Sequence, residues 1–158
     1  MTNDRFTQIF NMVWSRAEAV PASGRRWDVI LYDLPATNVE TAHQQIRDCI
    51  HQFAKALNKD EDELFSNMFK KAFKIMCLKS QEYSFENDKL YNFKRSCALF
   101  PHVFKRPSQA CLAFSIKHAV SCTDILTGKL SEKYLDEKLL DLLNYIVLMM
   151  ACQEEDWS

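Results

Sequence analysis

The side chains best suited to chemistry lie in a basic stretch of the chain and in the apolar segment that follows it. No Asp or Glu occurs between Lys89 and Thr123. The basic side chains of this stretch are Lys89, Lys94, Arg95, Lys105, Arg106, Lys117, His102 and His118. A stretch of this kind that faces carboxylates is suited to hold a phosphorylated ligand, either directly or through a divalent metal.

The carboxylates come from the last apolar segment, which has the pattern of a central helix. Glu137, Asp141 and Asn144 are spaced i, i+4 and i+7, so they form one stripe on that helix. Carboxylates on a largely buried helix are costly unless they are paired or bound to a cation. The stripe is therefore interpreted either as an exposed polar face, with Asp141 paired to a lysine, or as ligands of a magnesium ion.

The helix expected before this one offers complementary groups. Lys117 and Asp124 share one of its faces, and Lys117 is placed to meet either a phosphate or Asp141. Glu137, Asp141 and Lys117 are accordingly the candidate catalytic residues. His118 lies beside Lys117, and a lone histidine in such a helix is more often a hydrogen-bonded structural residue than a ligand contact.

A third group of candidate residues brackets an expected polar loop. Glu82 and Tyr83 lie where this loop begins, Asp88 lies where it ends, and Asn92 and Phe93 come just beyond it. Asn92 and Phe93 are suited to recognise a base by hydrogen bonding and stacking. The alternative interpretation is that Phe93 belongs to the core and that Asn92 braces the turn.

Composition argues against several classes of function. The chain has only two glycines, so it contains no glycine-rich phosphate loop, and it also lacks the GxSxG and HExxH motifs. Its net charge of −1 argues against non-specific nucleic-acid binding, because proteins that coat nucleic acid are usually strongly basic. No two of the six cysteines are spaced as CxxC, so reduced cysteines in the core are expected.

The apolar periodicity predicts an all-α, single-domain bundle of about six helices over residues 1–158. Residues 1–74 supply the N-terminal helices, and residues 75–153 supply the rest. The segment Trp27–Leu34 is rich in β-branched and aromatic residues and stops at Pro35, so a short strand or an extended arm is expected there.

The sequence also predicts where the protein works. Its N-terminus lacks the basic start and the long apolar core of a signal peptide. The most apolar run, Leu139–Ala151, is interrupted by Asp141 and Asn144 and is too short to span a bilayer. A cytoplasmic protein that makes no membrane contact is the expectation.

Four short motifs follow one another in the second half of the chain. They are Lys79-Ser-Gln-Glu82-Tyr83, Asn92-Phe93, Lys117-His118 and Glu137-Lys-Leu-Leu-Asp141-Leu-Leu-Asn144-Tyr145. Over residues 75–153 their order resembles a group of small bacteriophage and prophage helical proteins, the nucleotide-modification-associated or MazG-like proteins. That group shows a K-x-x-D/E-Y turn, an N-F, a K-H on a helix and a D-x-x-N-Y on the last helix.

The resemblance implies an all-α fold and a place in phage nucleotide metabolism, in the cytoplasm of the host. The related all-α nucleoside triphosphate pyrophosphohydrolases cleave between the α- and β-phosphates with Mg²⁺ held by glutamates and aspartates. They usually carry E-x-x-E on one helix and E-x-x-D on the next. Here Lys138 stands three residues before Asp141, and Glu137 stands four residues before it.

The first of three functional hypotheses is a Mg²⁺-dependent nucleotide pyrophosphohydrolase or a related nucleotide-processing protein. Its metal ligands would be Glu82, Asp88, Glu137 and Asp141. Its phosphate contacts would be Lys117, Lys94 and Arg95, which would offset charge that develops in the transition state. The base or sugar would contact Asn92, Phe93 and Tyr145. The remaining candidate ligand contacts are Tyr83, His118 and Asn144.

The second hypothesis is a binding protein without turnover, which sequesters a nucleotide or inhibits a host defence protein. Its partner anchors would be Trp14, Trp27 and Trp157, and its nucleotide binding would be indifferent to EDTA. The third hypothesis is a structural helical oligomer, in which Lys117 pairs with Asp141 and no cleft is open. A homodimer formed through the Trp27–Leu34 arm is a further expectation.

Overall fold

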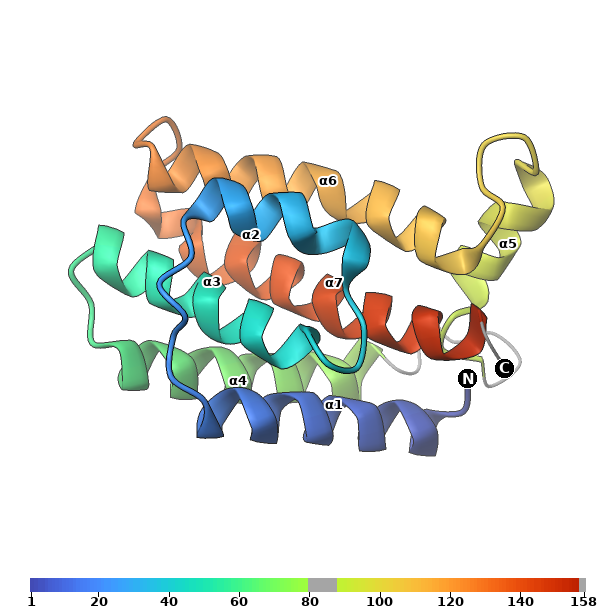
Figure 1. Cartoon of the computed structure of the whole chain (residues 1–158), viewed down its shortest axis with the longest axis horizontal. Coiled ribbons are helices and arrows are strands. Elements are labelled where there is room, and N and C mark those ends of the chain that lie inside the picture. Colours follow the sequence, from blue (N-terminus) through green and yellow to red (C-terminus); the bar gives the residue numbers. More distant parts are fainter. Residues whose placement is uncertain (80–87, 157–158) are drawn as a thin grey trace.

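The chain folds into an all-α bundle, which confirms the predicted fold class (Figure 1). The computed structural model describes residues 1–79 and 88–156, and no β-strand occurs among these residues. Seven α-helices and two short 3-10 helices are formed in this part of the chain. In chain order they are α1 (Asn3–Ala19), α2 (Trp27–Asp33), η1 (Leu34–Ala36), α3 (Ala42–Ala56), α4 (Glu61–Lys79), α5 (Tyr91–Leu99), α6 (Pro107–Leu126), η2 (Glu132–Tyr134) and α7 (Leu135–Asp156).

The segment expected to be a strand or an extended arm is helical, so that expectation is wrong. Ile30 and Leu34 are spaced i, i+4 and are both buried against the core. The indole N–H of Trp27 donates to Thr123 Oγ1 at 2.9 Å, and its ring meets Phe53 edge-on. These contacts explain the error, because burial of a helical stripe overrides the weak intrinsic preference of β-branched and aromatic residues for strands.

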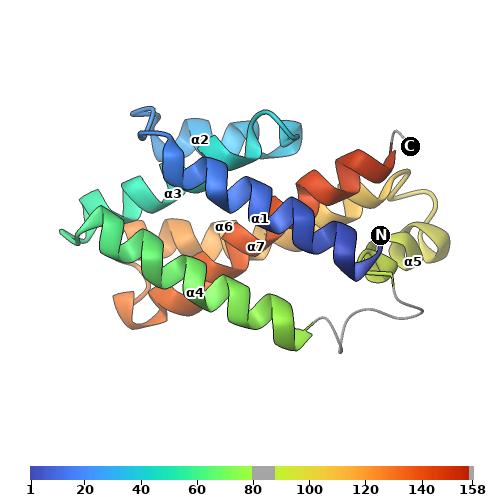
Figure 2. The same cartoon turned by 90° about the horizontal axis from the view of Figure 1, so that it is seen from below.

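Two of the three tryptophans expected to anchor a partner, Trp14 and Trp27, pack within the fold. Trp14 is only 1% exposed and packs against Phe10, Phe65 and Phe69. These aromatic contacts join α1 to α4, and the two helices lie side by side in Figure 2. Trp27 is engaged with α3 and α6, and Trp157 lies outside the described residues.

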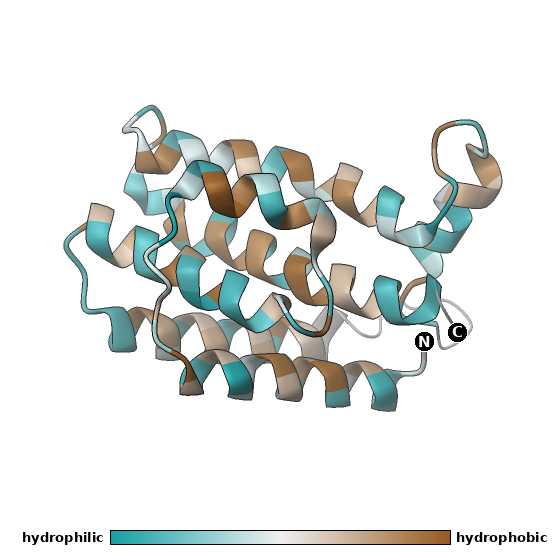
Figure 3. Ribbon diagram, in the orientation of Figure 1, coloured by the Kyte–Doolittle hydropathy of each residue, from teal (hydrophilic) through white to brown (hydrophobic). Residues whose placement is uncertain are grey.

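The helix α7 is the centre of the bundle and contacts α1, α3, α4 and α6. Its middle is apolar in Figure 3, whereas its end near the C-terminus is polar. Each buried leucine or methionine contributes roughly 1.5–3 kcal/mol when it is removed from water, so this helix holds the surrounding helices together. Its buried residues are Leu135, Leu139, Leu140, Leu142, Leu143, Ile146, Val147, Met149, Met150, Ala151 and Cys152.

The connection from α1 to α2 is fixed by a buried carboxylate on α3. Asp48 accepts from the backbone N–H of Ser23 at 2.8 Å, from the Ser23 hydroxyl at 2.6 Å and from the Gln44 amide at 3.0 Å. Gly24 follows with a φ of +80°, a conformation that favours glycine. The turn at Ser23 and Gly24 is therefore held in place by α3.

Five cysteines are free, and all of them except Cys97 are buried: Cys49, Cys97, Cys111, Cys122 and Cys152. Burial raises the pKa of Cys122 to about 12, so its thiol stays protonated at neutral pH. Cys49, Cys111 and Cys122 thus act as small core side chains, as the sequence predicts. Helices in the described part of the chain all fall short of the length and apolarity needed to cross a membrane.

Candidate functional site

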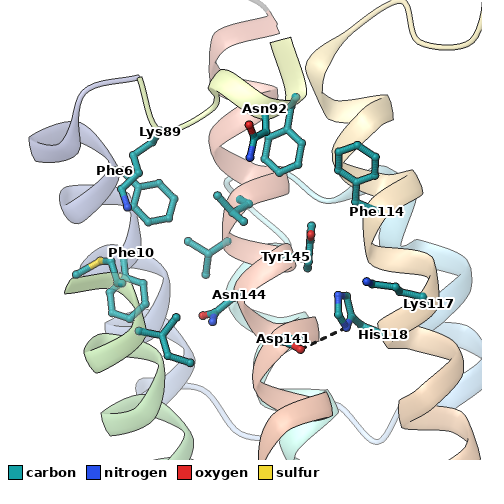
Figure 4. Close-up of a pocket in the computed structure, with 15 residues that line it drawn as sticks. Phe6, Phe10, Lys89, Asn92, Phe114, Lys117, His118, Asp141, Asn144 and Tyr145 are labelled. Atoms are coloured by element: carbon teal, nitrogen blue, oxygen red, sulfur yellow. Dashed lines mark ion pairs between the residues drawn. The ribbon is translucent and has the colours of Figure 1, made fainter. Parts of the chain in front are cut away.

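A cavity of about 380 Å³ lies between α1, α4, α5, α6 and α7 (Figure 4). Its volume is within the range of small-molecule sites, at the lower end. Apolar and aromatic side chains form most of its wall, and a few polar groups converge on its interior. The lining residues are Phe6, Phe10, Ile75, Met76, Lys89, Asn92, Phe93, Phe114, Lys117, His118, Asp141, Asn144, Tyr145, Val147 and Leu148.

The floor of the cavity is one face of α7. Asp141, Asn144, Tyr145 and Leu148 are spaced i, i+3, i+4 and i+7, so the helical repeat brings them to the same side. All four are half-buried, whereas their neighbours Leu142, Leu143 and Ile146 point into the core. The stripe predicted on the last helix thus lies at the boundary between the core and the cavity.

The wall formed by α6 supplies the basic groups. Phe114, Lys117 and His118 are spaced i, i+3 and i+4, which places them on one side of this helix. The ammonium group of Lys117 points into the cavity in Figure 4, and His118 lies between this lysine and Asp141. Within the described residues, the Lys117 ammonium forms no ion pair at 4.0 Å or less.

The upper and opposite walls come from α5 and α1. Asn92 is exposed and directs its amide toward the cavity, while Phe93 is buried and packs against Phe114 with ring centres 5.8 Å apart. On the opposite wall, the ammonium of Lys89 sits 5.2 Å from the ring centre of Phe6. Phe93 therefore belongs to the core and lines the cavity as well, and its contact with a base stays a prediction.

His118, Asp141 and Tyr145 form a connected group at one end of the cavity. The Nδ1 atom of His118 is 3.4 Å from Oδ2 of Asp141, and the imidazole stacks on the Tyr145 ring with centres 5.2 Å apart. The lysine expected as the partner of Asp141 is thus replaced by a histidine. Burial lowers the pKa of His118 more than Asp141 raises it, so the imidazole is neutral at neutral pH.

Glu137 does not reach the cavity, although the sequence places it on the same stripe as Asp141. It lies one turn nearer the start of α7, where its side chain is 64% exposed and contacts Lys138 at 3.5 Å. The prediction of a shared catalytic or metal-binding role for Glu137 and Asp141 is therefore not supported by their placement.

Asp88 and Lys94 are drawn into a separate ionic cluster. Lys94 Nζ is 2.6 Å from Asp88 Oδ2 and 2.6 Å from Glu155 Oε2, and the amino group of Met1 contacts both carboxylates. These groups satisfy one another and line no part of the cavity. The roles predicted for Asp88 in metal binding and for Lys94 in phosphate binding conflict with this pairing.

The remaining predicted site residues divide into two sets. Arg95 is exposed on α5 and does not line the cavity. Glu82 and Tyr83 lie outside the described residues. Asn92, Phe93, Lys117, His118, Asp141, Asn144 and Tyr145 meet in the cavity, so three of the four sequence motifs converge on it.

The four predicted metal ligands are not assembled by the described part of the chain. Of the three that the structure describes, Asp141 alone lines the cavity, and one of its oxygens faces His118. No group of three or more His, Cys, Asp and Glu side chains in these residues is arranged to hold a metal ion. The donor set present here does not fit Mg²⁺, which prefers several oxygen ligands.

Several lining residues were not predicted as site residues. Phe6 and Phe10 come from the N-terminal part of the chain, and Ile75 and Met76 come from the end of α4. They read as ordinary core residues, because the sequence does not show which helices pack against one another. The sequence places Lys89 in the basic stretch, but it does not show that Lys89 lies beside Phe6 at the wall of the cavity.

Comparison of the chain with protein-family models, with curated proteins and with solved structures gives no match. The resemblance of residues 75–153 to nucleotide-modification-associated proteins therefore stays a prediction. What the site does is argued below from its geometry and chemistry.

A second, more open groove of about 410 Å³ lies between α6 and the α2–η1 segment. Its lining is mainly apolar, and Ile116 and Val120 on α6 are more than half exposed. Asp124 is the charged residue among those that line it. The predicted homodimer contact near α2 falls beside this groove and stays a prediction.

Proposed function

We propose that this protein binds a single nucleotide in the cavity between α1 and α6. The observation that carries the proposal is the convergence of aromatic rings, two amides and two lysines on one hollow of ligand size. Aromatic walls with a few convergent polar groups are the usual makeup of sites for small organic ligands.

The base of the nucleotide would contact the aromatic and amide side chains of the cavity. Phe93, Phe114 and Tyr145 form a connected set of rings on one side of the cavity, and Phe6 and Phe10 form the other side. Asn92 and Asn144 each carry both a donor and an acceptor, which suits the edge of a heterocyclic base. A flat ring held between such walls is bound by stacking and by its edge.

Lys89 and Lys117 approach the cavity from different walls and supply the positive charge that attracts a phosphate (Figure 4). With His118 neutral, the charged side chains among the described lining residues are these two lysines and Asp141, so this part of the lining carries a net positive charge. That balance attracts an anion, and the small volume favours one nucleotide over a larger ligand.

Binding without metal-dependent hydrolysis is favoured over the pyrophosphohydrolase. Among the residues that the structure describes, one carboxylate faces the cavity, where the predicted mechanism requires several. Magnesium dependence stays a prediction, as do the phage origin and the inhibition of a host defence protein.

Calorimetric titration with nucleoside mono-, di- and triphosphates tests the proposal, once with Mg²⁺ and once with EDTA. We expect at least one nucleotide to bind equally well under both conditions, without release of pyrophosphate. Replacing Asn92 with Ala should weaken this binding roughly fivefold, because one hydrogen bond to the ligand is lost.

The matched control is Asn67→Ala, which removes an exposed amide on α4 and should leave the affinity unchanged. Failure of every nucleotide to bind would contradict the proposal. Magnesium-dependent release of pyrophosphate would support the hydrolase in its place.

A further inference from the structure

The contact between His118 and Asp141 favours one of the two positions that the ring hydrogen of His118 can take. Nδ1 of His118 faces Oδ2 of Asp141 at 3.4 Å. An ionised carboxylate can only accept, so the contact is favourable only when Nδ1 carries a hydrogen. The stacked ring of Tyr145 holds the imidazole in this orientation.

The other ring nitrogen, Nε2, is then a bare acceptor. The side chain of His118 is 12% exposed, and the charged groups that act on it are Asp141, Glu137, Lys117 and Lys138. Burial and the two lysines outweigh the two carboxylates, so the ring keeps one hydrogen at neutral pH. Because the negative charge of Asp141 at 3.4 Å favours that hydrogen on Nδ1, Nε2 has a lone pair to offer.

This lone pair of Nε2 faces the cavity, whose lining also includes the hydrogen-bond donor Lys117. Figure 4 shows the second ring nitrogen on the side away from Asp141, and the positive charge of Lys117 acts on the same imidazole. No hydrogen bond to Nε2 is formed by the described residues. A ligand group at this place must therefore donate to His118 and accept from Lys117.

A hydroxyl group meets both requirements, since its oxygen donates one hydrogen and accepts through two lone pairs. A fully ionised phosphate does not meet them, because it would set acceptor against acceptor at Nε2 and would lie near the carboxylate of Asp141. Of the two lysines in the cavity, Lys89 is therefore the one left to serve the phosphate.

We infer that a ribose hydroxyl of the bound nucleotide sits between Nε2 of His118 and the ammonium of Lys117, so that the cavity selects a nucleotide that carries this hydroxyl over the deoxy form that lacks it. Asp141 is a positioning residue in this arrangement, because it acts through His118. The inference rests on the proposed function and adds to it the class of sugar and the orientation of the ligand.

The tautomer is tested first, in the free protein. Long-range ¹H–¹⁵N correlation spectra of His118 at neutral pH should show hydrogen on Nδ1. Asp141→Asn should move the hydrogen toward Nε2, because an amide can donate to Nδ1 where a carboxylate cannot. Hydrogen on Nε2 in the unmodified protein would overturn the inference.

The selectivity is tested with the four ribonucleoside 5′-monophosphates and their 2′-deoxy and 3′-deoxy counterparts. For the ribonucleotide that binds best, removal of one hydroxyl should weaken binding roughly fivefold to tenfold, because two hydrogen bonds are lost. His118→Asn should largely remove this difference, since it deletes Nε2. The control His102→Asn changes an exposed histidine and should preserve it.

Equal binding of the ribo, 2′-deoxy and 3′-deoxy forms would overturn this inference and leave the proposed function standing. Absence of binding by every nucleotide would overturn both, whatever the tautomer spectra show. A thermal melt of each variant separates loss of the hydroxyl contact from loss of the fold.

Discussion

The imidazole of His118 stacks on the ring of Tyr145, with ring centres 5.2 Å apart and planes inclined by 27°. The two residues come from adjacent helices, α6 and α7, so the stack joins the basic wall of the cavity to its floor. The same histidine meets Asp141 at its edge. One imidazole thus links both helices at the point where ligand is proposed to bind.

His118 should make stability fall on mild acidification. Burial lowers its pKa in the folded chain, so the unfolded chain takes up a proton first as pH drops through about 6.5. The stabilising contribution is therefore complete above the unfolded pKa and is lost toward the folded pKa. Denaturant unfolding between about pH 7.5 and 5.5 should show a smaller loss for His118→Asn than for the unmodified protein.

An NMR titration of the histidines supplies the direct check of this pH effect. His118 and His43 should both titrate below the ordinary value, since burial lowers the pKa of each. A His118 resonance that titrates above the ordinary histidine value would contradict the assignment of a neutral imidazole.

Ile30 and Tyr32 decide whether α2 is helical in solution. In a strand they would share one face, whereas in α2 Ile30 is 1% exposed and Tyr32 is 84% exposed. Ile30→Ala should lower the free energy of unfolding by about 2–4 kcal/mol. Tyr32→Ala should change it by less than about 0.5 kcal/mol. Equal losses for the two variants would indicate the extended arm instead.

Asp48 should be essential for the connection between α1 and α2. Its carboxylate accepts three hydrogen bonds, two of them from Ser23. Asp48→Ala leaves these donors without their partner, and the free energy of unfolding should drop by about 3 kcal/mol. Asp62→Ala, at an exposed position in the first turn of α4, is the control and should cost far less. Similar losses for both would contradict the role given to Asp48.

Lys94 should contribute to the stability of the fold at neutral pH, and this contribution should be lost in acid. Although burial opposes ionisation, hydrogen bonds from Lys94 and the amino group of Met1 hold the pKa of Asp88 and of Glu155 below their ordinary values. Carboxylates of this kind stabilise the fold above their ordinary pKa and lose that effect as pH falls through the lowered value. Lys94→Met should therefore lower the melting temperature at pH 7, and the difference should shrink below about pH 4.

The control for Lys94 is Lys55→Met, which removes an exposed lysine on α3. It should leave the melting temperature nearly unchanged at every pH, because exposed charges contribute little. A difference between Lys94→Met and the unmodified protein that is constant with pH would show that the cluster does not act through its carboxylates.

The fold class and half of the site could be predicted from the sequence because both depend on helical periodicity. The spacing of Asp141, Asn144 and Tyr145 places them on one face of any helix, and the same holds for Lys117 and His118. Helical periodicity does not show which neighbouring helix packs against each stripe. The partner of Asp141 was therefore expected to be a lysine and is the adjacent histidine.

The errors have a common physical origin in tertiary packing. The residue types of Trp27 and Ile30 favour a strand. In the fold, Trp27 contacts α3 and α6 and Ile30 is buried, and both residues lie in a helix. Asp88 resembles a site residue in the sequence, yet the fold brings Lys94 and the N-terminal amino group to it. Phe6 enters the cavity because α1 packs beside α7, a pairing separated by most of the chain.

A crystal structure with a bound ribonucleoside 5′-monophosphate tests the central claim most directly. The account predicts ligand density in the cavity between α1 and α6, with the base among the aromatic rings near Asn92, a ribose hydroxyl at His118 and Lys117, and the phosphate toward Lys89. Ligand density elsewhere on the protein, with this cavity empty, would contradict it.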